Sequence, residues 1–136
     1  KVTDENRVFP TGFIDLWGIN KENELWIFEL KDISNTTAGI ISELFFYANF
    51  ANQILTKGLL EKTKSDFRGY QKLLKCTEEG ISKIQACFLA PAYHKELEDK
   101  KEAIVEELNN GQKSIEYRFL NYDHQKMSIL AEKNSE

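Results

Sequence analysis

Two short runs rich in aromatic and β-branched residues stand close together in the first quarter of the chain. They are FIDLWGI at 13–19 and LWIFELK at 25–31, and the five residues between them, NKENE, are all polar. Runs of this composition separated by a polar turn predict a β-hairpin. A hairpin alone is only marginally stable in water, so further strands or a helix must pack on its apolar face.

The rest of the sequence supplies such elements. Apolar residues recur at 40, 41, 44, 48, 51 and 55, the spacing of one helix face, which predicts a helix over 37–55. By the same kind of pattern we expect a short extended segment at 7–10, a helix over 66–76, a buried strand over 83–90, a helix over 96–108 and a strand over 114–122. The order ββααβαβ predicts an α/β fold, a central mixed β-sheet flanked by helices.

Length and composition indicate one domain over residues 1–136, and since the chain starts with Lys we favour a piece of a longer protein. No apolar run approaches the roughly 18 residues of a membrane span, so we expect no membrane partner. The net charge of −4 argues against a protein that binds DNA mainly by covering phosphates with Lys and Arg. The two cysteines, Cys76 and Cys87, are too few for a disulfide scaffold and predict a reducing, cytoplasmic location.

Three charged residues occupy positions where the hairpin pattern favours apolar ones: Asp15, Glu29 and Lys31. Glu29 and Lys31 are two apart on one strand, so they share a face of the sheet. Asp15 joins them on that face if it pairs with Glu29, which also pairs Ile19 with Leu25 around an odd-numbered loop. An even loop without a bulge would place the two carboxylates on opposite faces and mark the pattern as accidental.

Carboxylates buried together need a cation or a shared proton to relieve their repulsion. Two carboxylates and a backbone carbonyl form an oxygen site suited to Mg²⁺ or Mn²⁺. A lysine on the same face could orient a water molecule or stabilise charge on a phosphate. This combination suits the hydrolysis of phosphodiester bonds.

The arrangement of Asp15, then Glu29-Leu30-Lys31, on adjacent strands followed by a helix resembles the PD-(D/E)XK nuclease superfamily. The resemblance implies a restriction-endonuclease-like core in which Asp15 and Glu29 hold the metal. It also implies that Leu30 offers its backbone carbonyl to the metal and that Lys31 serves as the catalytic lysine.

The segment Gly12-Phe13-Ile14-Asp15 is similar to the G-x-x-D segment of the RecB-like branch of that superfamily. This branch often carries Q-x-x-x-Y on the next helix, and Glu43 and Tyr47 have that spacing, with Glu in place of Gln. The resemblance therefore implies that Glu43 and Tyr47 support the site.

The leading expectation is a Mg²⁺- or Mn²⁺-dependent nuclease that acts on DNA, or the nuclease domain of a larger protein. RNA is the other possible nucleic-acid substrate. Members of the family often form homodimers, so the resemblance also implies a possible homodimer. The alternative is a catalytically degenerate member of the superfamily that binds nucleic acid or a protein partner. The acidic balance of the chain and the absence of the family's helix upstream of the aspartate strand favour this alternative. The basic stretch 57–75, with interleaved aromatic residues, could either bind the backbone of a nucleic acid or form a solvated helix and loop.

Overall fold

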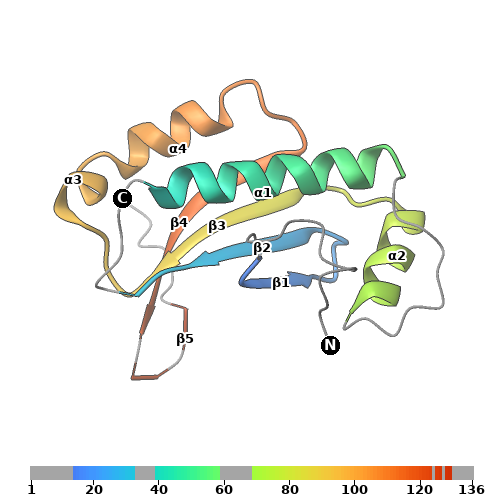
Figure 1. Ribbon diagram of the computed structural model, residues 1–136, viewed down its shortest axis with the longest axis horizontal. Helices are drawn as coiled ribbons and strands as arrows, with labels where there is room; N and C mark the ends of the chain where they lie inside the picture. Colours follow the sequence, from blue (N-terminus) through green and yellow to red (C-terminus); the bar gives the residue numbers. More distant parts are fainter. Residues whose placement is uncertain (1–13, 33–38, 59–68, 124, 127, 130–136) are drawn as a thin grey trace, which may run out of the picture.

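The computed structural model of the chain describes residues 14–32, 39–58, 69–123, 125–126 and 128–129 (Figure 1). The strands are β1 (Leu16–Ile19), β2 (Leu25–Leu30), β3 (Ile84–Ala90), β4 (Ile115–Asp123) and β5 (Ser128–Ile129). The helices are α1 (Gly39–Thr56), α2 (Tyr70–Glu79), α3 (Lys95–Glu98) and α4 (Lys101–Asn109).

The strands form a mixed sheet in the order β1-β2-β3-β4-β5. The β1–β2 hairpin is antiparallel, β2, β3 and β4 run parallel to one another, and the short β5 pairs antiparallel with the end of β4. Helices α1 and α4 lie over one face of this sheet, and α2 lies beyond one end (Figure 1). The predicted α/β fold with a central mixed sheet and flanking helices is confirmed.

The predicted elements within the described residues form close to their expected positions, with one clear difference. The region 96–108 is divided into α3 and α4, because Lys100 has a φ of −119°, outside the helical range. Leu97, Ile104 and Leu108 all reach the core, as they would in a single helix, so their spacing could not reveal the break. The expected extended segment at 7–10 lies outside the described residues.

The main core lies between α1 and the sheet. Ile40, Leu44 and Ala48 of α1 are fully buried, and they pack with Ile27 of β2 and Phe88 of β3. Since side chains alternate along a strand, the residues of β2 that face α1 are the odd-numbered ones. The next residue in this core-facing row is Glu29.

The opposite face of the sheet has a smaller apolar cluster built from Cys87, Leu89 and Leu120, flanked by Trp26 and Phe28. Within the described part of the chain, no helix covers this face (Figure 1). None of the described helices is both long enough and apolar enough to cross a membrane.

Candidate active site

The register of the β1–β2 hairpin decides where the predicted site residues lie. Ile19 pairs with Leu25 and Leu16 pairs with Phe28, and the loop closes through the N–H of Asn20, which donates to the carbonyl of Glu24. The loop is therefore odd-numbered, and the predicted register is confirmed. Continued by one residue beyond the Leu16–Phe28 pair, this register would set Asp15, which precedes β1, opposite Glu29.

Asp15 lies immediately before β1 and is exposed, with its carboxylate directed at the backbone of β2. Its Oδ2 accepts a hydrogen bond of 3.0 Å from the N–H of Leu30. In an extended strand the N–H and C=O of one residue point to the same side. The Leu30 carbonyl therefore faces the side on which the Asp15 carboxylate lies.

Glu29 is the charged residue of the hairpin that is buried in the core layer, with only 4% of its surface exposed. Its Oε1 lies 2.8 Å from Nζ of Lys31. The pKa of Glu29 is raised to about 7, chiefly by burial and in smaller part by the negative charges of Asp15 and Glu43, which together outweigh the lowering effect of Lys31. Near neutral pH this carboxyl group thus exchanges between a protonated and an ionised form.

Glu43 reaches the same lysine from the second turn of α1. Nζ of Lys31 donates to Oε2 of Glu43 over 2.8 Å, so that one ammonium group bridges two carboxylates. The hydrogen bond from Lys31 lowers the pKa of Glu43. Burial alone would lower the pKa of Lys31, but its bonds to Glu29 and Glu43 outweigh this effect and raise the pKa, so the ammonium stays protonated.

Tyr47 lies one helical turn beyond Glu43 and is partly buried. Its ring packs edge-on against Phe46, with ring centres 5.6 Å apart. The structure therefore brings Asp15, Glu29, Lys31 and Glu43 together at the end of β2, with Tyr47 one turn further along α1. Among the described residues, no three His, Cys, Asp or Glu side chains form a group that could hold a metal by themselves, so a backbone oxygen would be needed.

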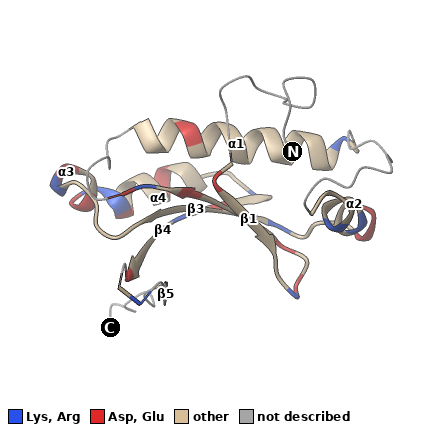
Figure 2. Cartoon of the chain, turned by 60° about the horizontal axis from the view of Figure 1, so that its bottom comes forward, with Lys and Arg blue, Asp and Glu red and all other residues tan. Residues whose placement is uncertain are grey.

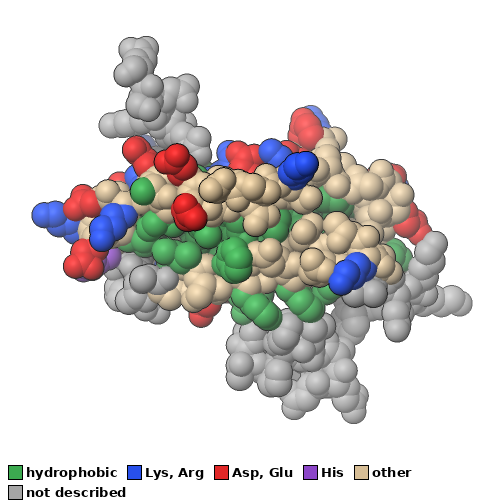
Figure 3. Space-filling view, turned by 90° about the horizontal axis from the view of Figure 1, so that it is seen from above, with side chains coloured by type: hydrophobic (Ala, Val, Ile, Leu, Met, Phe, Trp, Pro, Cys, Tyr) green, Lys and Arg blue, Asp and Glu red, His purple; other side chains and the backbone are tan. Residues whose placement is uncertain are grey.

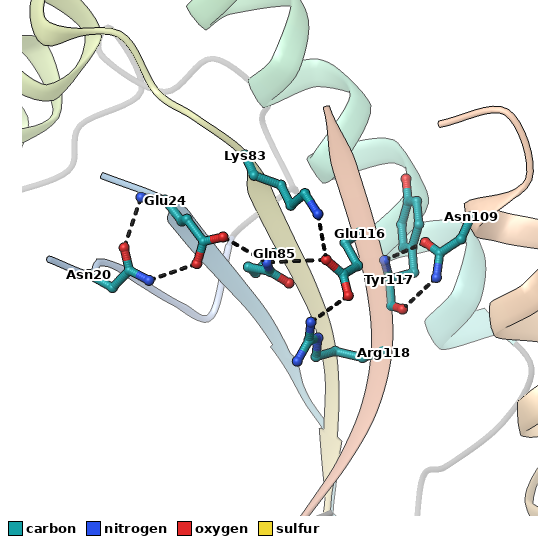
Figure 4. Close-up of polar contacts among 8 residues, drawn as sticks. All are labelled: Asn20, Glu24, Lys83, Gln85, Asn109, Glu116, Tyr117 and Arg118. Carbon is teal, nitrogen blue, oxygen red and sulfur yellow. Dashed lines mark hydrogen bonds and ion pairs between the residues drawn. The ribbon is translucent and has the colours of Figure 1, made fainter. Parts of the chain in front are cut away.

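A second polar cluster, not predicted from the sequence, crosses the sheet near the start of β3 and β4 (Figure 4). Glu116 is held by Lys83 at 2.8 Å and by Arg118 at 2.6 Å, and Gln85 donates to Glu24 at 3.1 Å. The bond from Lys83 lowers the pKa of Glu116. The only sequence signal was the alternation of charged residues along 114–122. The positive charges of Lys83 and Arg118 balance the negative charges of Glu24 and Glu116. We therefore interpret the cluster as a structural network that links β4, β3 and the start of β2.

Comparison of the chain with protein-family models, with curated proteins and with solved structures gave no match. Function is therefore inferred below from the side chains of the site.

Proposed function

We propose that this domain is a Mg²⁺- or Mn²⁺-dependent nuclease with a restriction-endonuclease-like core, which hydrolyses phosphodiester bonds of DNA. The observation that carries the proposal is the odd-numbered register of the β1–β2 hairpin. Continued by one residue beyond the Leu16–Phe28 pair, this register sets Asp15 across from Glu29, which is bonded to Lys31. An even-numbered loop without a bulge would have placed the two carboxylates on opposite faces of the sheet.

The residues present suit a hard divalent cation. Burial, and in smaller part the charge of Asp15, raises the pKa of Glu29, which means that its ionised form is unfavourable there and that a cation would stabilise it. Asp15, Glu29 and the Leu30 carbonyl would hold the ion, since oxygen donors are the ligands that Mg²⁺ and Mn²⁺ prefer. When bound, such an ion polarises a phosphate oxygen and lowers the pKa of a coordinated water.

Lys31 would act as a hydrogen-bond donor in this site. Because its carboxylate neighbours keep it protonated, it is suited to orient a water molecule and to stabilise negative charge that develops on the phosphate. Glu43 would position the ammonium group from α1, and Tyr47 would support that part of the helix. The same chemistry applies to RNA, which remains the second substrate class.

The test is a cleavage assay on single-stranded and double-stranded DNA and on RNA, with Mn²⁺ or Mg²⁺. We expect cleavage by the unmodified chain, and loss of at least about a hundredfold in rate for Glu29→Gln. Glu22→Gln, in the hairpin loop, is the matched control and should cleave normally, since Glu22 is exposed and lies at the opposite end of β2 from Glu29. Cleavage that persists in Glu29→Gln would contradict the proposal.

One observation favours the second candidate, a catalytically degenerate domain that binds nucleic acid or a protein partner. Lys31 already bridges Glu29 and Glu43 with two bonds of 2.8 Å, so these two carboxylates have a cationic partner without a metal ion. In such a domain, binding of the partner would be independent of metal and unchanged in Glu29→Gln.

A further inference from the structure

β1 is the outermost strand of the sheet, and the described part of the chain provides no strand on its outer side (Figure 2). The N–H of Asn20 bonds to the carbonyl of Glu24, so the backbone groups of even-numbered residues along β1 are directed at β2. The N–H and C=O groups of Trp17 and Ile19 therefore point outward. An exposed strand edge of this kind can pair with a strand of another chain.

This edge lacks the features that commonly prevent such pairing. The sequence of β1 is LWGI, without lysine or proline, and its register with β2 is continuous, without a bulge. Large apolar side chains beside the edge are exposed: Ile14 by 36%, Leu16 by 54% and Leu30 of β2 by 45%. Both the backbone groups and the side chains of the edge are therefore suited to a protein partner.

The apolar patch on the helical side of the molecule does not offer a comparable interface (Figure 3). Phe45 of α1 is 42% exposed there, and its ring already stacks on Tyr117 of β4 at 6.0 Å. The backbone groups of α1 bond within the helix, so a partner on this side would gain side-chain contacts alone. The β1 edge is the stronger candidate because it adds unpaired backbone groups to exposed apolar side chains.

Two exposed residues of opposite charge flank β1 and indicate which partner fits it. Asp15 precedes the strand and Lys21 follows it in the hairpin loop, each three residues from Gly18. A second copy of β1, placed antiparallel with the symmetry axis at Gly18, sets Asp15 of each copy across from Lys21 of the other. Opposite charges that face each other across antiparallel strands are favourable.

The uncharged residues of β1 fit the same register. Trp17 of each copy faces Ile19 of the other, and pairs of aromatic and β-branched residues stabilise antiparallel strands. Gly18 lies at the axis, where a Cβ would have no atom within 4 Å, so the two backbones can approach closely there. A strand from a different protein would need this pattern in reverse order, whereas a second copy has it by symmetry.

We propose that two copies of this chain pair through β1, antiparallel about Gly18, to form one continuous sheet. The N–H and C=O of Trp17 bond to those of Ile19 in the other copy, and the open edge of both copies is closed at once. The second copy thereby brings Lys21 next to the candidate active site at Asp15. The pairing itself depends neither on a metal nor on hydrolysis.

The first test is sedimentation equilibrium of the unmodified chain between about 20 and about 500 µM, in EDTA so that metal and cleavage do not contribute. Because β1 has 4 residues, the interface is small, and we expect a weak dimer with a dissociation constant of about 50 µM. A chain that is monomeric at every concentration would overturn the proposal.

Hydrogen exchange of single amides, followed by NMR over the same range, identifies the surface that pairs. The amides of Trp17 and Ile19 should exchange about threefold more slowly at the highest concentration than at the lowest. The amide of Gly18 already bonds to β2 and should exchange equally at both. A dimer in which the amides of Trp17 and Ile19 gain no protection would overturn the proposal.

A pair of charge variants tests the register. Lys21→Glu places a carboxylate across from Asp15 of the other copy and should weaken dimerisation by about tenfold. Lys95→Glu makes the same change of charge on exposed α3, far from β1 in the sheet order, and should weaken it by less than about twofold. Equal effects of the two variants would contradict the proposed pairing of Asp15 with Lys21.

Discussion

Nζ of Lys31 lies 2.8 Å from Oε1 of Glu29. The side chain of Glu29 is 5% exposed and lies on the same buried face of β2 as the apolar residues before it. Burial of an ion pair has a desolvation penalty that the attraction between the two charges only partly offsets. The hairpin thus carries at its end a pair that a purely structural role would not require.

Replacement of Lys31 should destabilise the fold, because it leaves Glu29 buried beside Asp15 with no cation. We expect Lys31→Met to lower the free energy of unfolding at about pH 8 by about 3 kcal/mol, measured by urea denaturation. Lys101→Met is the control, since Lys101 pairs with Glu98 at the surface at 2.6 Å, and it should cost less than about 1 kcal/mol. Equal losses in the two variants would show that the Glu29–Lys31 pair is no different from a surface pair.

Stability should also depend on pH through Glu29. Its pKa is raised from 4.5 to about 7, so the folded state holds the proton more tightly than the unfolded chain does. The stabilisation from this proton is complete below about pH 4.5 and is lost as the pH rises through about 7. The pKa of Glu43 is lowered, so its contribution to stability changes only at pH values below its ordinary pKa of 4.5. Glu43 therefore does not affect the pH dependence near 7.

Glu29→Gln should remove that dependence. Between about pH 5 and about pH 8, we expect the unfolding free energy of the unmodified chain to fall by on the order of 1–3 kcal/mol more than that of the variant. Parallel urea titrations at the two pH values measure the difference. The same fall in both proteins would mean that another group is responsible.

The sequence predicted that Glu29 and Lys31 share a face, because that depends only on the period of two along a strand. It left both an odd and an even hairpin loop open, and the odd loop that a shared site of Asp15 and Glu29 requires is the one observed. It could not predict that Asp15 would bond to the N–H of Leu30, since that contact depends on where β1 begins. The bridge from Lys31 to Glu43 depends on how α1 crosses β2, which the helical spacing alone does not determine. The bond from Lys83 to Glu116 escaped prediction for a similar reason, since the two residues are 33 positions apart and meet only when β3 pairs with β4.

Truncation of a core side chain to alanine should lower the free energy of unfolding far more than truncation of an exposed side chain of α1. Leu44 is fully buried against the sheet, so Leu44→Ala should cost about 2–5 kcal/mol of unfolding free energy in thermal or urea denaturation. Phe46→Ala should cost less than about 1 kcal/mol, because half of that side chain is in water. A loss in Phe46→Ala as large as that in Leu44→Ala would show that Phe46 contributes to packing as a core residue does.

The contact between α2 and β1 can be tested at Gly69. Its φ is 78°, and a Cβ there would lie 2.7 Å from Cζ2 of Trp17. Gly80 has a φ of 86° with open space around it, so Gly80→Ala reports the backbone strain alone, about 1 kcal/mol. Gly69→Ala should cost about 1–3 kcal/mol more, from displacement of the indole ring. Equal costs in urea denaturation would show that Trp17 yields without penalty.

The central claim, that Asp15 and Glu29 hold a divalent cation, is tested most directly by calorimetric titration with Mn²⁺ at about pH 8, where Glu29 is ionised. The unmodified chain and Glu22→Gln should show saturable binding at one site, and Asp15→Asn and Glu29→Gln should each lose it. Binding that survives in both site variants, or no binding in the unmodified chain, would contradict the claim and place the metal-independent binding domain first.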